Sequence, residues 1–464
     1  MKTTILIFLL FTLNVFSQAP GVSFPFEQFE NDGIPVSVLK NRRERIINNH
    51  SSKSLILSLS ADIRNRQNDV DYEYRQNSNF LYLTGCTQNK TALILIPGTA
   101  TLNNTTLNEI FFVNKRDVSS EVWNGVRMGA EEAKQYLGFA NTMDYTSLLS
   151  TLDTLLYNRD TLFITGLPTT SVKNPITGKS TFIDQQIKDY LHDKYPTLFI
   201  RTSLPDVAEM RELKDADEIR LLQKAIDISV QAHMATMRAA KPNMNEYELE
   251  AEMEYVFHKL GAEDVGYPSI VGSGYNSCML HYESNRRVAK EGEMILADCG
   301  AEYHGYTADI TRTFPITGKY NEEQTIIYNI VLEAQDSGIA ACRAGKPFKA
   351  AHEAARSVIT KNLLNLGIIK EPAETKYYFM HGTSHYLGLD VHDVGTNKPL
   401  RPGVVMTVEP GIYIPSGSPC DKRWWNIGVR IEDDILVTDG EPVNMSGKLP
   451  RTIPDIEKLM KQGQ

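Results

Sequence analysis

The sequence predicts a protein of mixed α/β (α+β) class with two successive domains, and three observations lead to this prediction. Strand-like apolar runs alternate with helical stretches over residues 22–205. A dense charged run, Glu209–Glu218, then precedes a strongly helical segment. Residues 215–450 repeat one order of helices and strands twice, and residues 451–464 form a tail. We therefore expect an α/β domain followed by a duplicated domain.

Composition indicates an ordinary globular protein. The 464 residues are 42% hydrophobic and 23% charged, which excludes fibrous and largely disordered classes. The 48 basic and 57 acidic side chains give a net charge of -9, and no basic block is present that could follow a phosphate backbone. A nucleic acid partner is therefore not expected.

The first 17 residues have the features of a secretory signal peptide. Lys2 precedes an apolar run, Ile5–Phe11, and small or polar residues follow it around Ser17. The run is shorter than the roughly 20 residues that span a bilayer. We expect cleavage near Gln18, export to the periplasm or the medium, and no stable membrane insertion of the mature chain. An N-terminal membrane anchor is the alternative.

The elements expected in the first domain follow from period-2 and helical patterns. The expected strands are Ser54–Leu59, Ala92–Ile96, Ile110–Val113 and Thr161–Thr165, and Glu131–Leu137 is expected to be a helix. After the charged run, apolar residues recur at helical spacing from Ile219 to Met234. The change in pattern places the domain boundary in this region.

The second domain contains the same arrangement twice. In the first half, Asn245 and Glu248 form a capping-box start of a helix that Gly261 ends. The expected strands and helices that follow are the strand pair Met294–Gly300 and Tyr306–Phe314, a helix starting at Asn321, a helix over His352–Leu366, and the strands Val404–Ile414 and Gly428–Val437.

Carboxylates interrupt the apolar runs of both strand pairs. Asp298 and Asp309 lie in the first pair, Glu409 and Glu432 in the second, and His385 lies between the pairs. A buried carboxylate without a partner is unfavourable, so each should pair with a cation. Four carboxylates and one imidazole form an oxygen-rich donor set suited to two divalent ions such as manganese, cobalt, iron or zinc. For any single acid, a hydrogen bond to arginine or to the backbone is the alternative.

This order of residues resembles the Asp, Asp, His, Glu, Glu signature of the metal-dependent pita-bread peptidases, which include methionine aminopeptidase, prolidase and aminopeptidase P. The matching runs are Ala308–Pro315, His381–His385, Val391–Asp393 and Val408–Gly411. The resemblance covers about Asp215–Pro450. Tyr74–Phe80 and Val122–Gly125 also resemble the N-terminal domain of aminopeptidase P, which methionine aminopeptidase lacks.

The resemblance implies a metal site with two divalent ions, manganese in preference to cobalt, zinc or iron. Asp309 and Glu432 would bridge the ions, Asp298 would bind one of them, and His385 with Glu409 would bind the other. A hydroxide held by the ions would attack the peptide bond before proline, while Glu409 transfers the proton to the leaving nitrogen.

Further residues receive roles from the same resemblance. His281 and His392 would donate hydrogen bonds to the substrate and to the developing oxyanion, and His381 is similar. Arg430 would orient a ligand carboxylate, with an ordinary salt bridge as the alternative. Tyr386 and Trp425 would line the proline pocket, unless they are simple core residues.

The implied function is removal of the N-terminal residue from peptides with proline in second position. Proline-containing peptides are the expected partners, and relatives are commonly homodimers or homotetramers. Three alternatives stay open at this point. Prolidase would cut dipeptides only, an inactive pita-bread domain would serve for binding, and a creatinase-like enzyme would act without metal, although the full ligand set argues against the last two.

Overall fold

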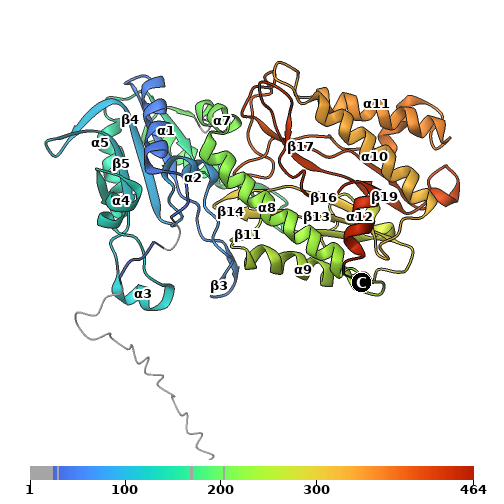
Figure 1. Ribbon diagram of the computed structural model, residues 1–464. Coiled ribbons are helices and arrows are strands. Elements are labelled where there is room, and N and C mark those ends of the chain that lie inside the picture. Colours follow the sequence, from blue (N-terminus) through green and yellow to red (C-terminus); the bar gives the residue numbers. More distant parts are fainter. Residues whose placement is uncertain (1–24, 29–30, 168–170, 202–203, 464) are drawn as a thin grey trace, which may run out of the picture. The chain divides into compact units, whose positions relative to one another are not determined.

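The computed structural model describes residues 25–28, 31–167, 171–201 and 204–463 (Figure 1). The expected signal peptide, residues 1–17, lies outside these residues. The described chain separates into two compact units, one built from residues 40–80 and 84–201, the other from residues 33–39, 81–83 and 204 onward. Among the described helices, none combines the length and the apolarity needed to cross a membrane.

The first unit is organised around a six-stranded mixed sheet with the order β10-β7-β1-β4-β5-β6. From Val36 to Arg201 the elements are α1 (Val36–Asn49), β1 (Ser54–Leu59), β2 (Asn65–Gln67), β3 (Val70–Asp71), α2 (Ser78–Thr84), β4 (Thr91–Leu102), β5 (Thr105–Val113), α3 (Val118–Asn124), α4 (Ala130–Leu137), β6 (Thr142–Asp144), α5 (Leu148–Leu156), β7 (Thr161–Thr165), β8 (Ser171–Lys173), β9 (Ser180–Phe182), α6 (Ile183–Lys194) and β10 (Phe199–Arg201). Leu55 and Leu57 of β1 share a buried cluster with Leu152 of α5 and Leu191 of α6, so these two helices cover one face of the sheet.

The four strands expected in this unit are present, but two of them are longer than their sequence patterns indicate. The strand expected over Ala92–Ile96 continues to Leu102 as β4, and the strand expected over Ile110–Val113 begins earlier, at Thr105, as β5. The register between β4 and β5 shifts between Leu95 and Ala100, so a bulge accommodates the Pro-Gly pair that lies between these residues. Asn103 and Asn104, both with positive φ, then close the hairpin.

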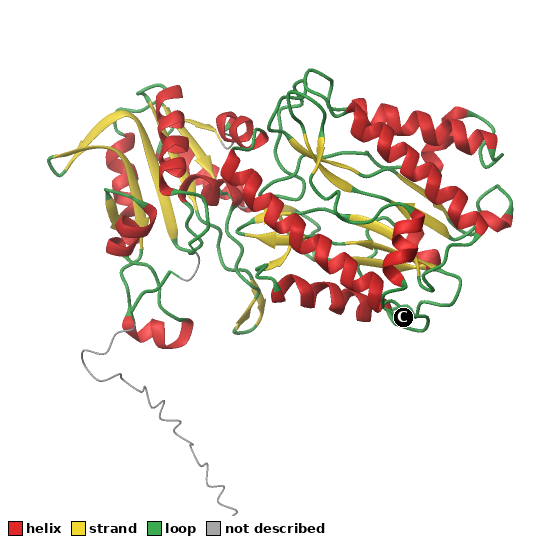
Figure 2. Ribbon diagram, viewed as in Figure 1, coloured by secondary structure: helices red, strands yellow, loops and turns green. Residues whose placement is uncertain are grey.

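The second unit consists of helices around several short antiparallel sheets (Figure 2). Its elements are α7 (Pro205–Glu212), α8 (Ala216–Ala239), α9 (Glu246–Lys259), β11 (Asp264–Val265), β12 (Ile270–Ser273), β13 (Met294–Asp298), β14 (Ala301–Tyr303), β15 (Tyr306–Thr307), β16 (Thr311–Pro315), α10 (Glu322–Ala341), α11 (Ala350–Asn365), β17 (Val405–Val408), β18 (Gly411–Ile414), β19 (Ile427–Arg430), β20 (Asp433–Leu436), β21 (Val443–Asn444) and α12 (Ile453–Met460). The repeated order of two helices and a strand pair, expected from the sequence, is present.

The capping-box start expected at Asn245 is present, and the helix expected from Asn321 also begins with a capping box. At α9 the Asn245 backbone N–H donates to the Glu248 carboxylate at 2.6 Å, and at α10 the Gln324 backbone N–H donates to the Asn321 side chain at 2.9 Å. Each bond satisfies a backbone or side-chain group at the first helical turn, where the chain has no intrahelical partner.

Each expected long strand pair is broken near its middle. In the first pair β13 pairs with β16 and β14 with β15, and in the second pair β17 pairs with β20 and β18 with β19. The breaks fall at Cys299–Gly300, Ala308–Ile310, Glu409–Pro410 and Ile431–Glu432. The expectation of continuous strands was therefore wrong at four places. Three of the four acidic residues singled out in the sequence lie in these breaks, and Asp298 ends β13 directly before one, so all four lie where the ladder is interrupted and side chains can be redirected.

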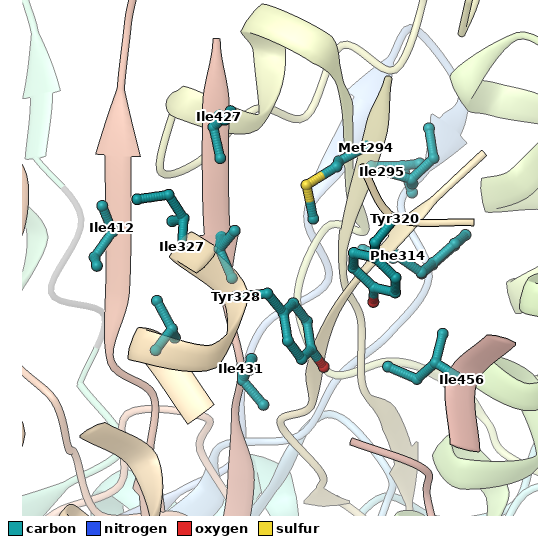
Figure 3. Close-up of a cluster of buried hydrophobic side chains, with 14 of the residues drawn as sticks. Met294, Ile295, Phe314, Tyr320, Ile327, Tyr328, Ile412, Ile427, Ile431 and Ile456 are labelled. Carbon is teal, nitrogen blue, oxygen red and sulfur yellow. The ribbon is translucent and has the colours of Figure 1, made fainter. Parts of the chain in front are cut away.

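A hydrophobic core lies behind these strand pairs (Figure 3). Met294 and Phe314, at the outer ends of β13 and β16, pack with Tyr328 of α10 and Ile456 of α12, and all four side chains are at most 3% exposed. Burying a side chain of this size stabilises the fold by about 1.5–3 kcal/mol. The core therefore holds in place the strands beside which the acidic residues lie.

Candidate metal centre

The second unit contains a cavity of about 410 Å³. All nine residues predicted as site residues line it: His281, Asp298, Asp309, His381, His385, His392, Glu409, Arg430 and Glu432. The structure thus brings together side chains that are spread over more than 150 positions of the sequence.

The histidine segment reaches the cavity because it runs beside β17. The Glu409 backbone N–H donates to the carbonyl of Thr383 at 2.8 Å, and the Thr407 N–H donates to the carbonyl of His385 at 3.0 Å. The Thr407 hydroxyl in turn accepts from the His385 N–H at 3.1 Å. These bonds place His385 next to Glu409, although neither of these two residues belongs to a strand.

Three of the predicted ligands meet at one point. Ligand atoms of Asp309, His385 and Glu432 all lie within 4.8 Å of one another. The His385 Nε2 atom is 3.3 Å from Asp309 Oδ2 and 3.6 Å from Glu409 Oε1, while its Nδ1 faces the carbonyl of Tyr386 at 3.1 Å. A ring whose Nδ1–H donates to a carbonyl presents Nε2 to a metal ion, so this geometry fits a metal ligand.

The carboxylates are crowded in a buried region, which makes their charges unfavourable. Burial raises the pKa of Glu409 to about 8. Burial and the charges of Asp309 and Glu409 raise the pKa of Glu432 well above its usual value. Burial also raises the pKa of Asp298, although Arg430 opposes this effect. Two divalent cations would supply the positive charge that four ionised carboxylates need, so the donor set fits such a pair.

The histidines of the cavity differ in charge. Burial disfavours the charged form of His385, but its hydrogen bond to Asp309 and the nearby acids raise its pKa to about 9. The same bond keeps the pKa of Asp309 below its usual value despite burial. Burial and Arg430 lower the pKa of His381 to about 3, and burial and His385 lower the pKa of His392. His381 and His392 are therefore neutral at pH 7, each with one nitrogen able to donate and one able to accept.

Arg430 connects several parts of the site. Its guanidinium donates to Asp298 at 2.5 Å, to the Tyr413 hydroxyl at 2.9 Å and to the Thr311 hydroxyl at 3.2 Å. The Tyr413 hydroxyl also lies 2.8 Å from His381 Nε2. The side chain of Arg430 is 3% exposed, so its charge-assisted hydrogen bond to Asp298 is shielded from solvent. This bond orients the Asp298 carboxylate.

Sequence reasoning missed two residues that support the ligands. The Tyr267 hydroxyl lies 2.7 Å from Asp298 and 2.6 Å from Asp309, and the Thr311 hydroxyl donates to Glu432 at 2.7 Å. Thr311 could have been suggested by its position two residues after Asp309, because alternate residues of the strand expected over Tyr306–Phe314 would face the same side. No sequence signal points to Tyr267, since it lies in a short loop before β12.

Two aromatic residues do not have the position that the resemblance implied. Among the described residues that line the cavity, neither Tyr386 nor Trp425 is present. Tyr386 is buried in a separate cluster, with its ring 4.4 Å from that of Phe348. The Trp425 indole N–H donates to the carbonyl of Ser418 at 3.0 Å, and the ring packs on the main core. Tyr386 is thus a core residue and Trp425 is partly buried against the core, which agrees with the alternative stated above.

Comparison with known proteins agrees with the fold and the site. Residues 220–439 match the model of metallopeptidase family M24, and residues 39–163 match the model of the aminopeptidase P N-terminal domain. Together with the duplicated strand pairs and the acidic cavity, these matches define a pita-bread metal-dependent hydrolase.

Relatives of this chain cover almost its whole length. An Xaa-Pro aminopeptidase of Escherichia coli (strain K12) is 33% identical over 437 residues, 91% of this chain and 97% of that protein. A structure of the aminopeptidase PepP of Pseudomonas aeruginosa is 34% identical, with a TM-score of 0.84 and coverage of 93% of this chain and 99% of that chain. A zinc-substituted E. coli aminopeptidase P in complex with product has a TM-score of 0.83 at 32% identity, with the same coverage. The chain therefore belongs to the aminopeptidase P family of M24 metallopeptidases, which confirms the resemblance and the fold class predicted from the sequence.

Proposed function

We propose that this protein is an exported aminopeptidase that removes the N-terminal residue from peptides with proline in second position. The observation that carries the proposal is the single cavity in which the five predicted ligands meet three further histidines and Arg430. The Xaa-Pro aminopeptidases among the relatives support the substrate class. Export rests on the sequence of residues 1–17 alone.

Asp298, Asp309, His385, Glu409 and Glu432 would hold two divalent ions. Such a pair supplies an acidified water and polarises the carbonyl of the scissile bond. The hard, oxygen-rich donor set favours manganese, with cobalt, zinc or iron as alternatives. The fit rests on the crowded carboxylates described above, whose ionisation needs added positive charge.

The chain's own residues would then handle protons and position the substrate. Glu409 accepts the proton of the attacking water and passes it to the leaving nitrogen, and bound cations would offset the burial that disfavours its ionised, proton-accepting form. His281 and His392, which line the same cavity, donate hydrogen bonds to the substrate and to the oxyanion that forms at its carbonyl. Arg430 keeps Asp298 oriented.

A peptide-length series tests this function. The protein is stripped with a chelator, reloaded with manganese, cobalt or zinc, and assayed with Arg-Pro-Pro, with a longer Xaa-Pro peptide and with Gly-Pro. We expect no hydrolysis after chelation and recovery with metal, with the tripeptide and the longer peptide both cleaved between the first residue and proline. Cleavage of Gly-Pro alone would identify a prolidase. A metal-replete protein that cleaves none of these peptides would favour a binding role and contradict the proposal. Whether the chain assembles into a homodimer or a homotetramer stays a prediction.

A further inference from the structure

A fully buried carboxylate outside the metal centre binds five hydrogen-bond donors. Glu246 is the first residue of α9 and is 0% exposed. Its Oε1 accepts from the Ser273 backbone N–H at 2.7 Å, from the Ser273 hydroxyl at 2.7 Å and from the Asn276 amide at 3.0 Å. Its Oε2 accepts from the Tyr282 hydroxyl at 2.8 Å and from the Arg287 backbone N–H at 2.8 Å.

The donors all belong to one loop. Ser273 ends β12, Asn276 lies in the following 3₁₀ helix, and Arg287 lies beyond the cavity-lining part of the loop. The Glu246 backbone N–H also donates to the carbonyl of Arg287 at 2.9 Å. Glu246 therefore joins both ends of residues 273–287, which we call the His281 loop.

The middle of the His281 loop faces the metal centre. Leu280, His281 and Glu283 line the cavity, and Tyr282, which donates to Glu246, lies between them in the sequence. The Arg430 guanidinium also reaches the carbonyl of Leu280 at 3.4 Å. The loop is thus attached to Glu246 on one side and to the Asp298–Arg430 pair on the other.

The start of α9 does not require the Glu246 side chain. The capping box of this helix is formed by Asn245 and Glu248, and the Glu246 carboxylate accepts no hydrogen bond from the described residues of its own helix. Removing an ionised carboxylate from water is costly unless donors replace the lost hydration. Here all of those donors come from the His281 loop, and hydrogen bonds to an ionised acceptor are about twice as strong as neutral ones.

We propose that Glu246 is a positioning residue that holds His281 in its place over the metal centre. This inference rests on the proposed function, in which His281 donates a hydrogen bond to the substrate. In the described part of the chain, Glu246 has no hydrogen bond to the predicted metal ligands or to the residues that line the cavity. It is connected to the cavity through Tyr282, which lies between two lining residues in the sequence. Its effect on the reaction must therefore pass through the loop.

The test uses the metal-loaded full chain and a double-mutant cycle. Glu246→Gln keeps the volume but turns one acceptor oxygen into an NH₂ group that faces donors. Tyr282→Phe removes one donor of five and keeps the ring. Glu248→Gln, on the same helix and outside the loop, is the matched control. Each is combined with His281→Ala, and kcat and KM for Arg-Pro-Pro, bound metal and hydrogen exchange of residues 274–283 are measured.

We expect Glu246→Gln to lower kcat/KM about 10- to 100-fold, as outer partners of site residues do. The metal content should be unchanged and exchange in residues 274–283 faster. In the His281→Ala background the further loss should be less than about twofold, because the residue being positioned is gone. Tyr282→Phe should show a smaller loss with the same dependence on His281, which keeps the test decisive if Glu246→Gln does not fold. Glu248→Gln should leave kcat/KM unchanged.

Equal losses in both backgrounds, or no loss at all, would overturn the proposal. If the metal-loaded wild-type protein cleaves no Xaa-Pro peptide, the proposed function fails separately. Hydrogen exchange still decides the loop's attachment in that case, since unchanged exchange in Glu246→Gln would show that the carboxylate does not hold the His281 loop.

Discussion

Replacing Glu409 by glutamine should have opposite effects on the metal-free and the metal-loaded protein. In the structure, burial raises the pKa of Glu409 from 4.5 to about 8. The pKa of Glu409 is higher in the folded chain than in the unfolded chain, so as the pH rises the unfolded chain releases this proton first. Ionisation of Glu409 therefore destabilises the folded, metal-free protein as the pH rises from about 4.5 to about 8.

The magnitude at pH 7 follows from this shift. At pH 7 the pH is about 2.5 units above the pKa of this residue in the unfolded chain, so ionisation stabilises the unfolded chain by about 3 kcal/mol at about 1.4 kcal/mol per unit. In the folded chain the residue is still mostly protonated, so ionisation stabilises that state very little. Glu409→Gln removes the titration. The metal-free variant should be up to about 3 kcal/mol more stable than the metal-free wild type at pH 7, and the difference should fall below about 1 kcal/mol at pH 4.5.

Urea unfolding of chelated protein at both pH values measures the difference. Glu441→Gln is the control, because Glu441 is 77% exposed in a surface pair with Arg343 and its replacement should leave stability almost unchanged at both pH values. With metal present the order should reverse, since glutamine is a weaker ligand, and kcat/KM should fall at least about 100-fold. A metal-free variant less stable than wild type at pH 7, or unimpaired turnover with metal, would refute the reasoning.

Three further predictions concern single side chains of the second unit. Arg430→Lys keeps the charge, but the lysine cannot reach both Asp298 and the Tyr413 hydroxyl. We therefore expect kcat/KM and metal affinity, measured by activity assays and metal titrations, to fall about 10- to 100-fold. A metal affinity equal to that of the wild type would contradict the orienting role. Burial lowers the pKa of His233 from 6.5 to about 4, so the unfolded chain binds its proton first as the pH falls. This residue should cost the wild type about 2 kcal/mol of stability between pH 7.5 and pH 5, and His233→Gln should lose stability less steeply in urea unfolding at those pH values; identical slopes would argue against it. Phe314→Ala should lower the free energy of unfolding by about 3–5 kcal/mol, because the ring is fully buried in the core, and a loss below about 1 kcal/mol would mean that the core does not depend on it.

Much of the local structure could be predicted because its determinants are close together in the sequence. The capping boxes at Asn245 and Asn321 need only residues three positions apart, and the apolar run at Ser54–Leu59 is itself the strand. The nature of the site was also accessible, since a carboxylate such as Asp298 in an apolar run has few stable environments other than beside a cation.

Only the tertiary structure decided where those acids point and what holds them. Gly300 and Pro410 are local signals of the breaks beside Asp298 and Glu409, but the direction that each side chain then takes depends on the partner strand and the neighbouring loop. Thr311 and Glu432 meet over 121 positions of sequence, and Glu246 binds donors 27–41 positions away. The types of residue and their spacing in the sequence indicate which chemistry the chain can perform. Hydrogen bonds between distant segments depend on the whole packed fold, and such bonds are what support the side chains of the site.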